Sequence, residues 1–315
     1  MAKKKGRVGA VISALSFGLA GGIALGTYVL APNLAGGSNE VRDSLETQLA
    51  DANQQIEIQD VQAKSADGFI ETMADGAVRD SLKERPVLVL RSADASDDDV
   101  SSVKHLLGSA GAVDSGTITL TEKFFSRDGA DGLKNIVSTT LPAGAQLSTE
   151  QLDSGTHAGE ALGSALMLNK DSAQPQATPE ERAIVLGALK ESEFISYDEG
   201  TILPAQVIVL VLGDDDGTGD SVSVENQVAF SRALDSRGSG VVVAARIKSA
   251  SDTGVVGKLR DNALSRQEVS TVDSVDQAWG AVATVLAARE QLDAKAGAYG
   301  AAASADAASP SPVGS

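Results

Sequence analysis

The chain has 315 residues, enough for one large domain or two small ones. Lysine and arginine number 26 against 43 aspartates and glutamates, and the net charge of −17 argues against binding nucleic acid or anionic lipid through the bulk of the chain. The absence of cysteine excludes disulfides, thiolate catalysis, cysteine-based zinc sites and iron–sulfur clusters.

The first segment has the pattern of a membrane anchor. Residues 1–7 form a basic flank, and residues 8–31 carry no charge. At about 1.5 Å per residue, a helix of this length spans a hydrocarbon core of about 30 Å. Pro32 directly after the small-residue end disfavours cleavage as a signal peptide. We therefore expect a retained transmembrane helix over 8–31, with a cytoplasmic N-terminus and an extracytoplasmic remainder in the cell envelope.

Three glycines inside this segment have the spacing of a helix-pairing motif. Gly18, Gly22 and Gly26 recur at intervals of four and lie on one face of a helix. Such spacing lets two helices approach closely in lipid, although the segment is rich in glycine and alanine throughout. The spacing predicts that these glycines support self-association in the membrane.

Residues 39–83 are predicted to form a helical stalk. Apolar positions recur at steps of four and three, which is the seam of a coiled coil. The seam includes Leu45, Leu49, Ile56 and Ile70. A coiled coil that binds a second copy or a protein partner and a single helix packed on its own domain both fit this pattern. Either would place a rigid rod of about 1.5 Å per residue after the membrane span.

From residue 86 to 294, apolar runs alternate with helical segments, which predicts βαβ units and an α/β domain with a mostly parallel sheet flanked by helices. Thr178 is the predicted N-cap of the helix that starts at Pro179. Residues 295–315 contain too little apolar bulk to fold and are predicted to be a disordered tail. Strands are expected near 87–92, 117–121, 194–198, 205–213, 240–247 and 268–273, and helices near 97–107, 129–139, 156–168, 179–190, 221–237 and 274–294.

The stretch "VIVLVLGDDDGTGD" ends a buried strand in an acidic loop. Asp214, Asp216, Gly217 and Thr218 have the spacing of the first signature of haloacid-dehalogenase phosphatases. That signature normally lies on the first strand of its domain and needs a later acidic pair, and neither condition is met here. Asp and Gly also occur in any strand-to-helix turn. We therefore favour a solvated acidic turn over a weak divalent-cation loop or a phosphatase.

No pattern of residues indicates catalysis or a cofactor. The histidines are His105 and His157, and no serine or acid completes a catalytic arrangement with them. The methionines are Met1, Met73 and Met167, too widely spaced for a soft copper site within one chain. We predict a protein that is not an enzyme, with no catalytic, cofactor or metal residues.

The chain resembles the MctB family of actinobacterial envelope proteins, which is named for copper transport. The resemblance rests on the order of several segments: "SALSFGLAGGIALG", "DSGTITLTEKF", "LPAGAQLST", "RGSG" and "EVSTVDSVDQAWGAVATVLAAREQLDAKAGAYG". It implies an anchored envelope protein with a role in copper efflux or homeostasis.

Relatives in corynebacteria called SteB are linked instead to cell separation. In those relatives the anchored protein binds a SteA partner and controls a peptidoglycan hydrolase. The resemblance therefore leaves a non-enzymatic adaptor in cell division as the alternative function.

Overall fold

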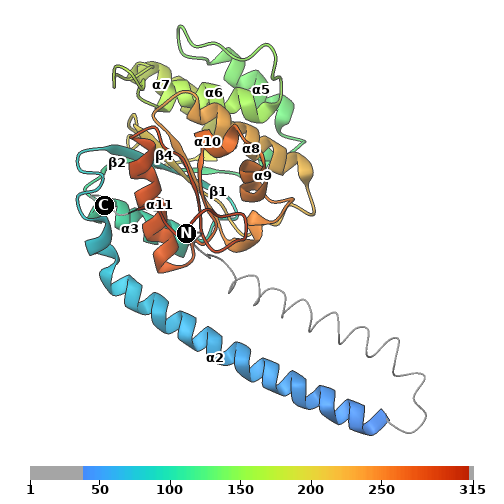
Figure 1. Cartoon of the computed structure of the whole chain (residues 1–315). Helices are drawn as coiled ribbons and strands as arrows, with labels where there is room; N and C mark the ends of the chain where they lie inside the picture. Colours follow the sequence, from blue (N-terminus) through green and yellow to red (C-terminus); the bar gives the residue numbers. More distant parts are fainter. Residues whose placement is uncertain (1–37, 312–315) are drawn as a thin grey trace, which may run out of the picture. The chain divides into compact units, whose positions relative to one another are not determined.

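A computed structural model describes residues 38–311 (Figure 1). The chain divides into two units, residues 1–66 and residues 67–315. Helix α2 spans Ser38–Val78, so its residues up to Ala66 belong to the first unit and the remainder to the second. The predicted basic flank and transmembrane span, with Gly18, Gly22 and Gly26, lie outside the described residues. Among residues 38–311, no helix has both the length and the apolar character needed to cross a membrane.

The second unit is built on a seven-stranded sheet with the order β3-β2-β1-β4-β5-β6-β7. All neighbouring strands are parallel except β2 and β3, which are antiparallel. The predicted α/β class with a mostly parallel sheet is confirmed. The strands are β1 (Pro86–Ser92), β2 (Val113–Leu120), β3 (Ile195–Ser196), β4 (Val207–Val211), β5 (Val241–Ala244), β6 (Ser270–Val272) and β7 (Ala298–Tyr299).

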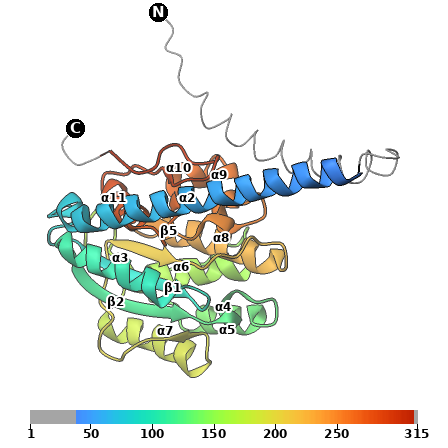
Figure 2. The same ribbon diagram turned by 90° about the horizontal axis from the view of Figure 1, so that it is seen from below.

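Helices cover both faces of this sheet (Figure 1). Helices α3 and α11 lie beside each other on one face, while α5, α6, α7 and α8 lie on the other (Figures 1 and 2). Thr178 caps α7 through a complete capping box, as the sequence predicts. The helices of this unit after α2 are α3 (Asp97–Ser109), α4 (Glu122–Phe125), α5 (Ala130–Thr139), α6 (Ser154–Leu166), α7 (Pro179–Glu191), α8 (Ser221–Asp235), the 3-10 helix η3 (Ile247–Ala250), α9 (Val255–Asp261), α10 (Ser265–Glu268) and α11 (Ala278–Gln291).

The central strands do not alternate in polarity because both of their faces are buried. Leu88, Ile208 and Val243 point into the core under helices α4 to α9. Val89 and Val209, from the same strands, point into the second core under α3 and α11. The two-sided burial explains why the sequence reads as continuous apolar runs.

The last part of the predicted stalk belongs to the domain. Helix α2 ends at Val78, and Ala74, Val78 and Leu82 are buried in the core with α3 and α11. The stalk boundary at residue 83 is therefore too late, because a helix that packs on its own domain has the same apolar spacing as a coiled-coil seam.

The predicted disordered tail also differs from the structure. Ala298–Tyr299 form strand β7 at the edge of the sheet, and the chain then folds back so that Ala307 lies beside Tyr299. Backbone pairing and buried polar contacts fix this segment, and neither depends on apolar side chains. The composition of the segment therefore gave no sign of its order.

Candidate functional site

The fold places its candidate site at the carboxyl ends of β1 and β4. The chain runs from β1 to β2 on one side and from β4 to β5 on the other, and a crevice at such a switch point is where doubly wound folds bind ligands. Asp94 follows β1, and Gly213 and Asp214 follow β4. A Cβ atom at Gly213 would lie 2.2 Å from Oδ2 of Asp94, so the two loops are in close contact.

Ion pairs join the loops at this switch point. Asp99, at the start of α3, accepts hydrogen bonds from Nε and Nη2 of Arg246 at 2.8 and 3.0 Å. These bonds raise the pKa of the Arg246 guanidinium. Asp214 accepts a hydrogen bond from the backbone N–H of Lys248 at 3.0 Å and pairs with its Nζ at 3.1 Å. The groups that could hold a small ligand here already bind each other.

The other aspartates of the acidic loop hold its backbone. Asp215 accepts from the N–H of Gly217 at 2.9 Å. Asp216 accepts from both N–H and Oγ1 of Thr218, and these bonds lower the pKa of Asp216. Asp220 is the N-cap of α8. The loop is therefore a hydrogen-bonded acidic turn.

An acidic cavity lies next to the Asp99–Arg246 pair, between Asp67–Val78 of α2, α3 and the start of α11. Its volume is about 450 Å³. No lysine or arginine lines it, so its field attracts cations. The ionisable groups of the lining are Asp67, Glu71, Asp75, Asp98, Asp99, Asp276 and His105.

His105 is the histidine that lines this cavity. Its Nε2 lies 2.9 Å from Oδ1 of Asp75, and Ser109 donates a hydrogen bond to the same carboxylate oxygen at 2.8 Å. The hydrogen bond from Ser109, together with His105, lowers the pKa of Asp75, so this carboxylate stays charged. The sequence did not predict the cavity, since its residues come from three segments that only the fold brings together.

The remaining soft ligands are dispersed. His157 is buried, with Nε2 3.0 Å from the carbonyl oxygen of Ser148. Met167 is buried against Gly238, and Met73 is exposed on α2. Within residues 38–311, no three His, Cys, Asp or Glu side chains are arranged to hold a metal ion.

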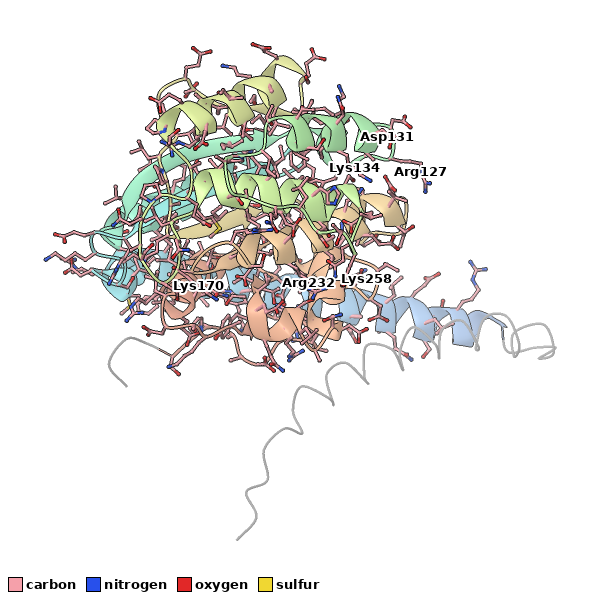
Figure 3. The ribbon with its side chains drawn as sticks, turned by 90° about the horizontal axis from the view of Figure 1, so that it is seen from above. Arg127, Asp131, Lys134, Lys170, Arg232 and Lys258 are labelled. Carbon is pink, nitrogen blue, oxygen red and sulfur yellow. The ribbon has the colours of Figure 1, made fainter. Side chains whose placement is uncertain are left out.

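A second cavity, of about 580 Å³, lies between α8, α9 and the start of α6. Arg232 and Lys258 lie close together at this cavity (Figure 3). Asp153, Glu225 and Asp261 also line it, so charges of both signs are mixed and the cavity has no strong preference for one sign.

The predicted stalk residues are placed on α2. Leu49 and Ile56 are exposed, and Leu45 and Ile70 are half-buried. Pairing of this seam with a second copy or a protein partner stays a prediction.

The sequence contains a second glycine stripe, which our predictions missed. Gly155, Gly159 and Gly163 of α6 lie against α8, and a Cβ atom at each would come within 2.2 to 2.6 Å of an α8 or Arg237 atom. Their four-residue spacing equals that of the glycines in the predicted span. In this case it lets two helices of the domain pack closely.

These observations define a doubly wound α/β domain whose switch-point loops are joined by ion pairs, with an acidic cavity beside them. Sequence comparisons identify the family to which this domain belongs. The family model described as "Copper transport outer membrane protein, MctB" matches residues 8–310, and the chain belongs to this family. The chain is 34% identical over 287 residues to proteins named copper transporter MctB from Mycobacterium bovis and Mycobacterium tuberculosis H37Rv, covering 90% of each chain. The protein of that name from Mycobacterium leprae is 33% identical over 289 residues, covering 89% of this chain and 90% of the relative.

Proposed function

We propose that this protein lowers intracellular copper as a membrane-anchored, non-enzymatic component of the cell envelope. The observation that supports this most directly is the family match over residues 8–310, together with relatives named copper transporters that match 90% of the chain. The match includes the apolar segment 8–31, which we propose to be the single membrane span. The basic flank then stays in the cytoplasm, and the domain lies outside the membrane.

Two ion pairs at the switch point support the non-enzymatic part of the proposal. Asp99 is bound by Arg246, and Asp214 by Lys248. Asp214 would be the nucleophile of a phosphatase, but here it holds a backbone N–H and a lysine instead. We therefore propose that the α/β domain serves as a scaffold and does not bind a substrate at the switch point.

Copper enters this proposal as cargo, not as a resident metal. The acidic cavity raises the local concentration of cations at its mouth. Imidazole and carboxylate are both ligands that Cu(II) accepts, and His105 stands beside Asp75 in the cavity that Glu71 also lines. Side chains that do not surround a single ion are suited to a copper ion that is bound and then released. Transfer across a membrane then needs an assembly, formed with a partner or with further copies through the stalk seam.

The test is total cellular copper in a deletion strain and its parent, both grown with added copper. We expect the deletion strain to accumulate more copper, and the full chain to restore the parental level. Complementation with His105→Ala plus Glu71→Ala is expected to restore less, while Asp252→Ala, a change on an exposed loop, restores fully.

Two outcomes oppose the proposal. Equal copper in the deletion strain and its parent contradicts the transport role. Equal copper with chained, unseparated cells would instead favour the adaptor alternative with a SteA-type partner.

A further inference from the structure

A third cavity, of about 440 Å³, lies beside α3 and over the ends of strands β1, β2 and β3. It shares no lining residue with the acidic cavity. Val100 is the one apolar side chain in its lining, and four serine and threonine hydroxyls are the largest group. These hydroxyls belong to Ser101, Thr117, Thr119 and Ser196. We call this space the hydroxyl cavity.

The register of the sheet brings these hydroxyls to one face. Thr117 pairs with Val89, and Thr119 pairs with Arg91. Val89 is buried under α3 and α11, so both threonines lie on that face of the sheet. Ser196 pairs with Thr119 and shares the face. Where the central strands carry buried valines, the two outer strands carry accessible hydroxyls.

The charges of the hydroxyl cavity cancel. Arg91 and Lys104 are its cations, and Asp97 and Asp198 are its carboxylates. Arg91 donates a hydrogen bond to Asp97, and Nζ of Lys104 donates to Oγ1 of Thr117 at 2.9 Å. A cavity without net charge offers no general attraction to an anion or a cation.

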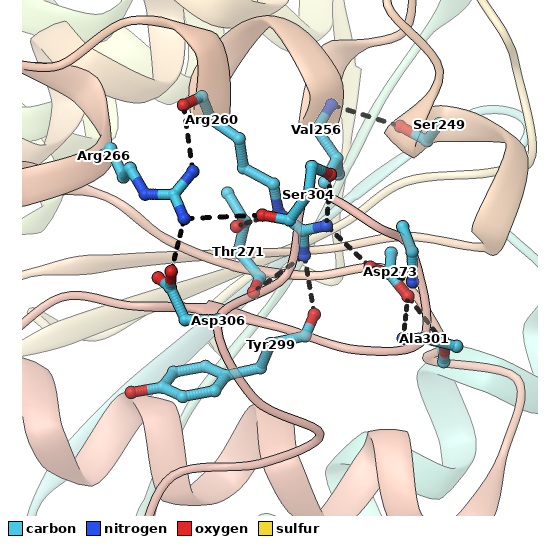
Figure 4. Close-up of polar contacts among 12 residues, drawn as sticks. Ser249, Val256, Arg260, Arg266, Thr271, Asp273, Tyr299, Ala301, Ser304 and Asp306 are labelled. Carbon is cyan, nitrogen blue, oxygen red and sulfur yellow. Dashed lines mark hydrogen bonds and ion pairs between the residues drawn. The ribbon is translucent and has the colours of Figure 1, made fainter. Parts of the chain in front are cut away.

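Buried polar groups elsewhere in the domain bind one another, as the surroundings of Arg260 show (Figure 4). Arg260 is 3% exposed, and its side chain pairs with Asp273 at 2.6 Å. It also donates to Oγ1 of Thr271 at 2.9 Å and to the carbonyl of Tyr299 at 2.6 Å. Asp273 accepts from the N–H of Ala301 at 2.7 Å. Each nitrogen of the Arg260 guanidinium is therefore satisfied within the chain.

The hydroxyl cavity differs because its lining keeps free hydrogen-bonding groups. Nε of Arg91 is buried and has no partner within residues 38–311. The hydroxyls of Ser101, Thr119 and Ser196 likewise make no hydrogen bond to this part of the chain. An unsatisfied buried donor is costly, so a group that enters the cavity and accepts from Arg91 gains affinity.

A peptide strand is not the occupant that this edge of the sheet favours. Such a strand would need free backbone groups along β2. The N–H of Leu203 already donates to the carbonyl of Ser115 at 3.0 Å, and the N–H of Thr121 donates to the carbonyl of Phe194 at 3.0 Å. The free groups near β2 are therefore side chains rather than backbone.

We propose that the hydroxyl cavity binds a neutral saccharide. Each hydroxyl of a sugar donates one hydrogen bond and can accept two, which matches a lining of hydroxyls, a free N–H and carboxylates without net charge. The cavity is concave and has several convergent polar groups, as small-ligand sites do. This site is separate from the proposed role in copper transport, and neither proposal depends on the other.

The first test measures binding to the full chain in a detergent without a sugar headgroup. The probes are neutral hexasaccharides of glucose, mannose and galactose, hexagalacturonate, which has a carboxylate on each ring, and an end-blocked serine–glycine hexapeptide. We expect a neutral hexasaccharide to slow hydrogen exchange in the peptides that contain Thr117–Thr119 and Ser196. Calorimetry should show tighter binding of that saccharide than of hexagalacturonate.

Three results of this test would overturn the proposal. The first is the absence of binding by every neutral hexasaccharide. The second is tighter binding of hexagalacturonate, which would mean that the cavity selects an anion. The third is protection of the same region by the hexapeptide alone, which would assign the cavity to a peptide.

The second test removes hydroxyls from the cavity. Thr119→Val plus Ser196→Ala should raise the Kd of the bound saccharide about tenfold, because two hydrogen bonds are lost. Ser138→Ala plus Thr139→Val is the matched control, since it removes two exposed hydroxyls from α5. Ser101→Ala, on the exposed side of α3, weakens binding without a change in the sheet and decides the question if the first variant does not fold. A Kd equal to that of the control in these variants would refute the site.

Discussion

Arg246 and Asp99, which are 147 residues apart in the chain, form a two-bond ion pair across the mouth of the sheet, with Nε–Oδ2 and Nη2–Oδ1 distances of 2.8 and 3.0 Å. Asp99 is 4% exposed, while the Arg246 side chain is 36% exposed. The pair joins the start of α3 to the segment that follows β5, and it occupies the place where related folds hold a ligand.

Replacing Arg246 by alanine should destabilise the domain, because it leaves the buried Asp99 carboxylate without its partner. Breaking a fully buried pair costs about 3–5 kcal/mol, and the partial exposure of Arg246 reduces this to roughly 2 kcal/mol. Urea unfolding measures the change. Lys248→Ala, which removes the more exposed partner of Asp214, should cost less than about 1 kcal/mol. Equal losses of unfolding free energy for Arg246→Ala and Lys248→Ala would show that the Asp99–Arg246 pair stabilises the domain no more than the Asp214–Lys248 pair does.

The glycine stripe of α6 predicts opposite effects for two Gly→Ala changes. A Cβ at Gly159 would lie 2.6 Å from the carbonyl oxygen of Phe230 and 2.8 Å from Cβ of Ala233. We expect Gly159→Ala to force α6 and α8 apart and to cost about 1–3 kcal/mol. Gly187 of α7 has open space around its Cβ position, so Gly187→Ala should stabilise by about 0.5–1 kcal/mol. Thermal melts of the two variants with the same sign would contradict the packing described here.

Asp235 predicts a pH dependence of stability. Burial, reinforced by the nearby Glu268, raises the pKa of this carboxyl to about 7, although it accepts a hydrogen bond from the N–H of Val241. The folded state therefore keeps the proton between about pH 4 and 7, where the unfolded state has lost it. Stability from this group is greatest at low pH and falls as the pH rises through 7, by up to about 4 kcal/mol.

The variant Asp235→Asn tests that sign. Asparagine keeps an oxygen that can accept from Val241 but has no charge to bury. It should raise the melting temperature at pH 8 by clearly more than at pH 5, where only part of the penalty has developed. A gain of the same size at both pH values would mean that the carboxyl is already ionised in the folded protein at pH 5.

The stalk predicts that self-association depends on one helix face. Leu49→Asp plus Ile56→Asp places two charges on the predicted seam and should abolish crosslinking between copies in the membrane. Ile58→Asp plus Val61→Asp makes the same chemical change away from the seam and should leave crosslinking intact. Unchanged crosslinking in the first variant would support a single unpaired helix.

Local pattern in the sequence determined the fold class. Each central strand is a short apolar run, several helices follow a polar N-cap, and Thr178 with Pro179 marks the start of a helix without tertiary help. These signals depend on neighbours a few residues apart, so the parallel sheet and most helix positions could be predicted. The acidic turn at Asp214–Asp220 could be predicted for the same reason.

Tertiary structure alone decided the features that join distant segments. The acidic cavity needs Asp75, His105 and Asp276 from three distant segments, and the ion pair at the switch point needs Asp99 beside Arg246. The segment after Gly297 folds because Arg260 and Asp273 bind its backbone, and backbone groups are the same in every sequence. A chain poor in apolar residues can therefore be ordered by partners that lie elsewhere, which no composition rule detects.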